Sequence, residues 1–418
     1  MANKEIQKSK IIKSSPVYYG WLVLFAATIG LIMTLPGQTV IVSVFIDKII
    51  ADLGQSRTKV SLMYALATLL GSFALPFVGR FIDKRGPRLS VIIISLLFAL
   101  ACVYMSFING LVMLFIGFVL IRSLGQGSLA LVSQHVINLW FIRRRGLTIG
   151  ISGVGFAMGV AFLPSLIEII INKYDWRMAY IILGLIVAAT ILPLGALLFR
   201  GHPESFGLEP DGANEKPNKA LETNYTAAEA RKTGVFWLFT AATITTSMLA
   251  TGLLFHNYNI LAENGLNRDL ATKVFIPIGF LAAAANLITG YLLDKIAPRY
   301  VLSVAMMLLV STLVVATQIN SLTGIYIYGA LLGTMQGTAG AISSTVFAHH
   351  FGRRHLGAIK GLVTTLSVAG SALGPVLFSF GYDMFSSYSK VILFSALLPL
   401  AIAIAAPFIK PVNQRPSS

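Results

Sequence analysis

Long apolar runs, separated by short charged or turn-forming segments, dominate the pattern of the chain. Residues 89–121 contain no Asp, Glu, Lys or Arg and are divided at Asn109-Gly110, and residues 300–352 also lack these four types and are divided near Asn320-Ser321. A helix needs about 20 apolar residues to cross a bilayer, so each run predicts a pair of spanning helices. The same criteria, applied to the whole chain, predict twelve spans at 17–46, 58–82, 88–108, 111–140, 145–171, 176–199, 235–262, 269–293, 299–319, 322–350, 357–382 and 387–409.

Two charged turns repeat each other. GRFIDKRGPR at 79–88 and GYLLDKIAPR at 290–299 place Gly79 and Gly290, and likewise Asp83 and Asp294, 211 positions apart. Gln126-Gly127 and Gln336-Gly337 recur at an offset of 210. The sequence therefore predicts an all-α membrane protein with two pseudo-symmetric six-helix bundles, an organisation typical of carriers that work by alternating access.

A polar, turn-rich stretch separates the two halves. It predicts five regions: an N-terminal tail at 1–16, a six-helix bundle at 17–199, a linker at 200–232, a second bundle at 233–409 and a C-terminal tail at 410–418. Within the linker, AAEARK at 227–232 predicts a short surface helix.

Composition supports a membrane location. Of the 418 residues, 56% are hydrophobic and 11% are charged, against about 25% charged in soluble domains. The net charge of +16 does not indicate a nucleic-acid partner, because the basic residues lie between apolar spans. Most of them fall in the segments on the same side as the termini, which predicts a protein of the cell membrane with both termini in the cytoplasm. The single cysteine, Cys102, excludes an intramolecular disulfide.

The chain resembles the major facilitator superfamily. The motif G-x-x-x-D-K/R-x-G-x-R after the second span is matched by residues 79–88, and residues 290–299 match a weaker copy in which Ala297 replaces the glycine. Three segments, YYGWLVL at 18–24, LWFIRRRGLTIGISGVG at 139–155 and FHNYNILAENGL at 255–266, are similar to monocarboxylate and oxalate/formate porters. The resemblance implies a secondary transporter of a small organic monocarboxylate with the proton as candidate coupling ion. Those porters carry an arginine where this chain has Asn286, which disfavours a doubly charged anion.

Arg122 is the one basic residue in the middle of a predicted span, and Gln126 shares its helical face. A buried charge costs several kcal/mol, so it needs a partner or a water-filled cavity. One interpretation is that Arg122 faces the central cavity and attracts an anion or responds to coupling protons. The other is that it binds backbone carbonyls of a neighbouring helix. Superfamily members with an arginine here have the pattern R-x-x-Q-G, whereas this chain has one more residue before Gln126-Gly127.

His256 lies in the outer part of the seventh span beside Asn257 and Tyr258. A histidine titrates near neutral pH and suits proton coupling, and the alternative is a histidine held by hydrogen bonds near the outer interface. Glu168, the acid inside a predicted span, is expected to reach water or pair with Lys173. The remaining candidates for substrate binding or coupling are polar residues in or next to spans: Gln38, which follows the helix break at Pro36-Gly37, Asn286 and Gln336.

The charged turns are candidates for gating. Asp83 and Asp294 each end a span beside several cations, so contacts with arginines of the other half could hold the cytoplasmic side shut. The alternative is a signal that only sets topology. The gating candidates are Asp83, Arg88, Arg143, Asp294, Arg299 and Arg353.

Motifs of other function classes are lacking in the sequence. It has no phosphate-binding loop and no nucleophile motif, so we expect neither an enzyme nor a cofactor, and no His/Cys/carboxylate cluster has the spacing of a metal site. We expect a monomer whose partners are a small solute, candidate coupling protons and the lipid bilayer. The second function that the sequence leaves open is efflux of drug-like or amphipathic compounds.

Overall fold

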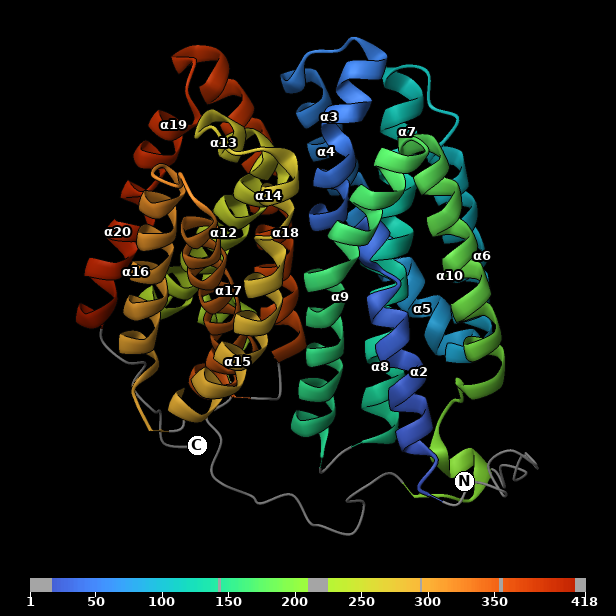
Figure 1. Cartoon of the computed structure of the whole chain (residues 1–418). Coiled ribbons are helices and arrows are strands. Elements are labelled where there is room, and N and C mark those ends of the chain that lie inside the picture. Colours follow the sequence, from blue (N-terminus) through green and yellow to red (C-terminus); the bar gives the residue numbers. More distant parts are fainter. Residues whose placement is uncertain (1–16, 142–143, 210–224, 294, 353–355, 410–418) are drawn as a thin grey trace. The chain divides into compact units, whose positions relative to one another are not determined.

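The computed structural model describes the chain except residues 1–16, 142–143, 210–224, 294, 353–355 and 410–418, and except the side chains of residues 76, 83, 145–146, 348 and 356–358. The regular elements of the described residues are helices (Figure 1). They belong to two compact units, one formed by Met1–Leu53 and Leu70–Pro217 and the other by Gly54–Leu69 and Asn218–Ser418.

The helices of the first unit follow the predicted spans closely. They are α2 (Gly20–Ile32), η1 (Leu35–Gly37), α3 (Thr39–Leu53), α5 (Leu75–Arg85), α6 (Pro87–Met105), α7 (Leu111–Ile121), η2 (Arg122–Leu129), α8 (Ala130–Trp140), α9 (Arg145–Lys173), α10 (Trp176–Leu198) and η3 (Pro203–Phe206). The first span is discontinuous, as Pro36-Gly37 predicts, because proline has no N–H with which to continue the helix. It also extends to Leu53 rather than ending at residue 46.

The second unit holds the remaining elements. They are α4 (Arg57–Ser72, of which residues 57–69 belong here), α11 (Ala227–Ala230), α12 (Gly234–Phe255), α13 (Asn257–Glu263), α14 (Arg268–Thr272), α15 (Phe275–Leu293), α16 (Pro298–Ala316), α17 (Leu322–Phe351), α18 (Leu356–Phe385), α19 (Tyr388–Ser395), α20 (Leu397–Ala405) and η4 (Ala406–Phe408). The surface helix expected at 227–232 is present as α11, with a capping box between Thr226 and Glu229. Most of α4, expected in the first bundle, groups with the second unit, where the ring of Tyr64 packs on Phe255.

Eleven helical stretches of the described chain are long and apolar enough to cross a membrane. The predicted span that is not among these eleven, 322–350, forms the 30-residue helix α17, whose many glycine, threonine and serine residues lower its mean hydropathy. These small residues allow α17 to pack closely on α15, since a Cβ on Gly333 or Gly337 would collide with backbone atoms of Ile278 or Ala282.

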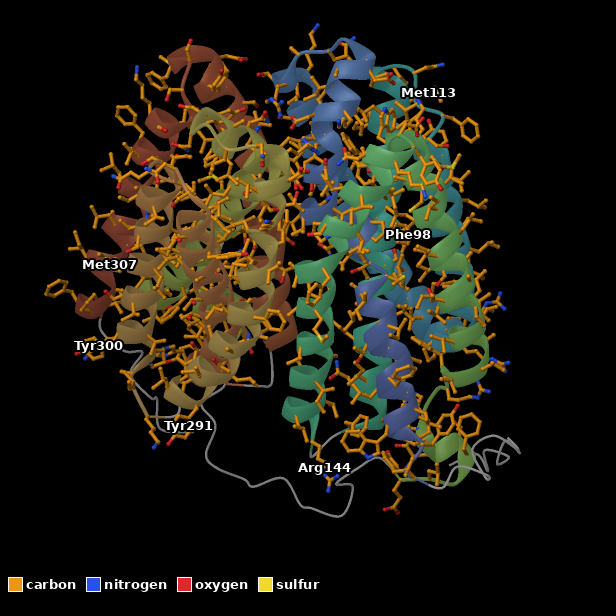
Figure 2. All side chains as sticks on the ribbon, in the orientation of Figure 1. Phe98, Met113, Arg144, Tyr291, Tyr300 and Met307 are labelled. Carbon is orange, nitrogen blue, oxygen red and sulfur yellow. The ribbon has the colours of Figure 1, made fainter. Side chains whose placement is uncertain are left out.

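Small and hydroxyl-bearing residues also join α12 to α18. Gly374 has no room for a Cβ beside the carbonyl of Met248, so this glycine allows the two helices to pack closely. The hydroxyl groups of Thr251 and Ser371 lie 3.0 Å apart across the same contact. Outward-facing side chains are apolar in contrast, and Tyr300 and Met307 of α16 point away from the core (Figure 2).

Two segments that carry the resemblance to monocarboxylate porters contact each other at one end of the first unit. The hydroxyl of Tyr18 donates to the carbonyl of Trp140 at 2.8 Å, and the rings of Tyr18 and Tyr19 pack on Trp140. Trp21 packs on Phe141. The tyrosine and tryptophan residues of these motifs therefore fasten the start of α2 to the end of α8.

Candidate functional site

Arg122 forms a hydrogen bond with the break in the first span. In an uninterrupted helix the carbonyl of Gly37 would accept from the N–H of Ile41, but that N–H bonds Gln38 instead. The guanidinium of Arg122 donates to the Gly37 carbonyl at 3.1 Å. Arg122 is 3% exposed, so its charge is held inside the unit by a backbone acceptor that the break has released.

The segment that begins at Arg122 is a π-helix, Arg122–Leu129. Within it, the side-chain hydroxyl of Ser128 donates to the carbonyl of Ser123, five residues earlier. In an α-helix such side-chain bonds reach back three or four residues. A π-helical turn holds one residue more than an α-helical turn. It therefore accommodates the extra residue between Arg122 and Gln126-Gly127 without rotating the rest of the helix.

Two glycines allow the break and the π-helix to touch. A Cβ on Gly37 would collide with the carbonyl oxygen of Ile121 and lie 3.0 Å from the amide nitrogen of Gln126. A Cβ on Gly125 would collide with the ring of Phe98, which is fully buried. We call this contact of η1 with η2 the Gly37–Arg122 junction.

A cavity of about 290 Å³ with a mixed polar and apolar lining opens beside the junction, within the first unit. Its polar lining comes from the break, from α8 and from α9, and consists of Thr34, Gln38, Gln134, Asn138 and Ser152. Gln134 and Asn138 are one turn apart and so share a face of α8. The apolar lining is Leu31, Ala130, Ile137, Ile149 and Phe156, with Gly153 between.

The described lining residues carry amide and hydroxyl groups, and none of them is ionisable. Gln38 donates from Nε2 to the hydroxyl of Thr34 at 3.4 Å, and Thr34 donates in turn to the carbonyl of Leu31 at 2.7 Å. Helix α3 begins at Thr39, next to Gln38, so the positive end of its dipole lies at the cavity wall. Such a site can bind a polar solute by hydrogen bonds and can tolerate one negative charge.

In the second unit, His256 is fully buried at the corner between α12 and α13. Its Nε2 lies 2.9 Å from the carbonyl oxygen of Pro375, and its Nδ1 lies 3.3 Å from the hydroxyl of Tyr388. Both ring nitrogens therefore have partners, which agrees with the interpretation that hydrogen bonds hold this histidine in place.

The neighbours of His256 are buried as well. Asn257 reaches the carbonyl of Ala271 at 3.5 Å, and the guanidinium of Arg268 lies over the ring of Tyr258 at 4.1 Å. On α15, Asn286 donates to the carbonyl of Gly337 at 3.3 Å. Gly337 follows the half-buried Gln336 in the sequence, so Asn286 contacts the residue next to Gln336.

The structure brings together only part of the candidate set. Gln38 lines the cavity, and Arg122 and the half-buried Gln126 belong to the junction beside it. Asn257 and Tyr258 follow His256 in the other unit and contact α14 instead. Thr34, Gln134, Asn138 and Ser152 are cavity residues that the sequence analysis missed. A usable signal existed, because Thr34 and Gln38, like Gln134 and Asn138, are polar pairs at helical spacing inside apolar spans.

The gating candidates are described only in part. Asp294, Arg143 and Arg353, and the side chain of Asp83, lie outside the described residues, while Arg88 is exposed. Arg299 donates to the carbonyl of Ile409 at 3.2 Å. Glu168 is 4% exposed, which corrects the expectation that it reaches water. Among the described residues no group of three metal-ligating side chains is present.

Comparison with known proteins decides the family. The sequence profile of the Major Facilitator Superfamily matches residues 20–375 and 262–418. The chain belongs to the major facilitator superfamily. This member is therefore a multi-pass membrane transporter and not an enzyme.

Its relatives include carriers of organic acids. Monocarboxylate transporter 4 of Mus musculus is 24% identical over 381 residues, 87% of this chain and 77% of that protein. The probable L-galactonate transporter of Escherichia coli (strain K12) is 25% identical, over 87% of this chain and 84% of that protein. The hexuronate transporter of Bacillus subtilis (strain 168) is 22% identical, over 88% and 87%.

Solved structures match the same fold. A bacterial homolog of the human lysosomal transporter Spinster, in an inward-facing and unoccupied conformation, matches with a TM-score of 0.72 and 17% identity. The match covers 94% of this chain and 96% of that one. It supports the superfamily fold and says nothing of substrate.

Proposed function

We propose that this superfamily member is a secondary active transporter that moves a small organic monocarboxylate by alternating access. The proton is the candidate coupling ion, with Arg122 and His256 as coupling candidates. The protein resides in the cell membrane as a monomer with both termini in the cytoplasm, and its charged turns act in gating.

The cavity of the first unit carries this proposal. The side-chain amides of Gln38, Gln134 and Asn138 can donate hydrogen bonds to a carboxylate. The N-terminal end of α3 also favours a negative charge. A half-helix N-terminus at an anionic group is a recurring arrangement in secondary transporters. None of the described lining residues carries a full positive charge that would suit a second carboxylate.

The names of the relatives agree with this chemistry. Monocarboxylates, hexuronate and L-galactonate are all carboxylate anions. The hydroxyls of Thr34 and Ser152 add partners for a hydroxylated acid.

Counterflow in proteoliposomes tests the function. We expect trans-stimulated uptake of at least one of labelled lactate, pyruvate, galactonate or glucuronate by liposomes that contain the protein. Gln38→Leu and Asn138→Leu should each raise KM about tenfold, since a hydrogen bond to a charged group contributes roughly 1.5–3 kcal/mol. Gln318→Leu, an exposed residue after α16, is the matched control and should leave KM unchanged.

The alternative, efflux of amphipathic compounds, predicts another outcome. Liposomes would show no carboxylate counterflow, and expression in a strain without efflux pumps would raise resistance to such compounds. That pair of results would reject the monocarboxylate proposal and leave the family assignment intact.

A further inference from the structure

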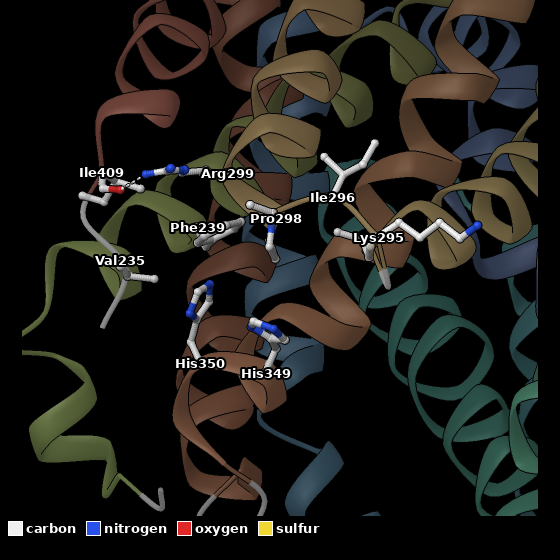
Figure 3. Close-up of a pocket in the computed structure, with 11 residues that line it drawn as sticks. Val235, Phe239, Lys295, Ile296, Pro298, Arg299, His349, His350 and Ile409 are labelled. Atoms are coloured by element: carbon white, nitrogen blue, oxygen red, sulfur yellow. Dashed lines mark hydrogen bonds between the residues drawn. The ribbon is translucent and has the colours of Figure 1, made fainter. Parts of the chain in front are cut away.

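The second unit has a separate pocket of about 350 Å³ (Figure 3). Unlike the described lining of the first cavity, its lining includes basic side chains. Its walls come from the start of α12, the turn between α15 and α16, the last turn of α17 and the residue after η4. Five helix ends therefore meet at this pocket. In a protein whose helices span a bilayer, helix ends lie at the depth of the lipid headgroups.

Basic and apolar side chains line the pocket together. Lys295 and Arg299 lie on opposite sides of it, and the imidazoles of His349 and His350 lie between them (Figure 3). Phe239 forms part of the apolar wall, and its ring is 5.8 Å from that of His350. No carboxylate is found among the described lining residues, and Asp294 lies outside the description.

Local contacts hold the two cations at opposite edges of the pocket, with their charged ends directed away from each other (Figure 3). Arg299 donates to the carbonyl of Ile409 and to the hydroxyl of Tyr300, both at 3.2 Å, and its guanidinium has further N–H donors. Lys295 contacts the hydroxyl of Tyr291, and its Nζ lies 4.3 Å from the centre of that ring. The cations are therefore fastened through neutral partners, which leaves their positive charge uncompensated by these contacts.

We propose that this pocket binds the headgroup of an anionic phospholipid. The phosphate lies against Arg299 and the imidazoles, with the charge of Lys295 at the rim, and the glycerol end of the acyl chains covers the apolar wall at Phe239. Basic pockets among the ends of spanning helices are suited to such headgroups. A bilayer lipid is the source argued here, because the pocket combines headgroup depth with an apolar wall; free phosphate has the same anionic chemistry but would leave that wall uncovered.

Titration of the purified protein in detergent tests the site. Thermal stabilisation is measured against dioleoylphosphatidylglycerol, dioleoylphosphatidylcholine and inorganic phosphate. We expect the anionic lipid to stabilise the protein at lower concentration than either of the other two. Lys295→Gln/Arg299→Gln should weaken its apparent Kd roughly 30-fold, because each basic residue near a membrane surface contributes a factor of about five.

The internal repeat offers a matched control. Lys84→Gln/Arg88→Gln removes the same two charges from the corresponding turn of the first unit, where both side chains are exposed, and should leave the apparent Kd unchanged. The single variant Lys295→Gln, at an exposed residue, should fold normally and weaken binding about fivefold.

Three results would overturn the proposal. Equal loss of binding in the control variant would mean diffuse attraction rather than a site. Equal binding of phosphatidylcholine would remove the role of the anion. Equal stabilisation by inorganic phosphate would remove the lipid as the source.

Discussion

Arg122 shows how a single polar residue can be kept inside a membrane protein. Its guanidinium is almost fully buried, and it donates to a carbonyl that the break at Pro36-Gly37 has removed from helical bonding. The guanidinium thus supplies a donor to the acceptor that the break has released, and each gains a hydrogen-bond partner in the interior. The contact supports a structural role for Arg122 and is compatible with a role in coupling.

Arg122→Met keeps the length of the side chain and removes its hydrogen bonds. We expect the melting temperature to fall, in line with a loss of about 1.5–3 kcal/mol for a hydrogen bond to a charged group, and uptake to be abolished while membrane insertion persists. Arg144→Met, at an exposed arginine of the same unit, is the stability control. Unchanged stability and uptake would remove Arg122 from both roles.

Gly37→Ala tests the close approach of η1 and η2. The added Cβ would meet the carbonyl oxygen of Ile121, and overpacking of this kind costs about 1–3 kcal/mol. Gly79→Ala places a Cβ in open space on helix α5 and should be neutral or slightly stabilising. Equal melting temperatures for the two variants would argue against the junction.

At the scale of elements, apolar run length and punctuation predicted the helix positions to within a few residues for most spans. The first span was placed too short because Asp47, Lys48 and Asp52 look like loop residues, yet they lie in α3. The extra residue before Gln126-Gly127 was evident in the sequence, but the sequence analysis did not infer from it that the helix widens to a π-helix. The cavity was missed because polar pairs mark a face, whereas the sequence does not say which faces meet.

The π-helix makes a distinctive prediction. Deletion of Leu124 removes the extra residue and should convert η2 to an α-helix, so that the rest of α8 keeps its orientation and the protein stays monodisperse. Deletion of Val136, a buried residue of regular α8, should rotate the following residues by about 100° and abolish folding. Size-exclusion profiles and melting curves compare the two, and similar damage from both would contradict the role given to the π-helix.

At the scale of the molecule, the internal repeat predicted two related bundles, and the contacts do divide the described chain into two compact units. The sequence did not predict that residues 54–69 group with the second unit, because repeat offsets report duplication and not tertiary contacts. Gating by the charged turns stays a proposal.

Asp83→Asn addresses gating. If Asp83 holds one side closed, the variant should slow exchange severalfold with little change in KM, because binding and the interconversion of states are separate steps. Asp269→Asn, at the first turn of α14, serves as the control. Exchange at the parent rate would assign Asp83 to topology alone.

The most direct test of the account is access to the cavity from both faces of the membrane. Gln134→Cys places a thiol in the cavity wall, and the native Cys102 is fully buried, so the parent protein should give little background. In sealed, oriented vesicles we expect an impermeant maleimide to label Gln134→Cys from either face, and a transported monocarboxylate to slow the labelling. Labelling from one face only, with or without the solute, would contradict transport through this cavity by alternating access.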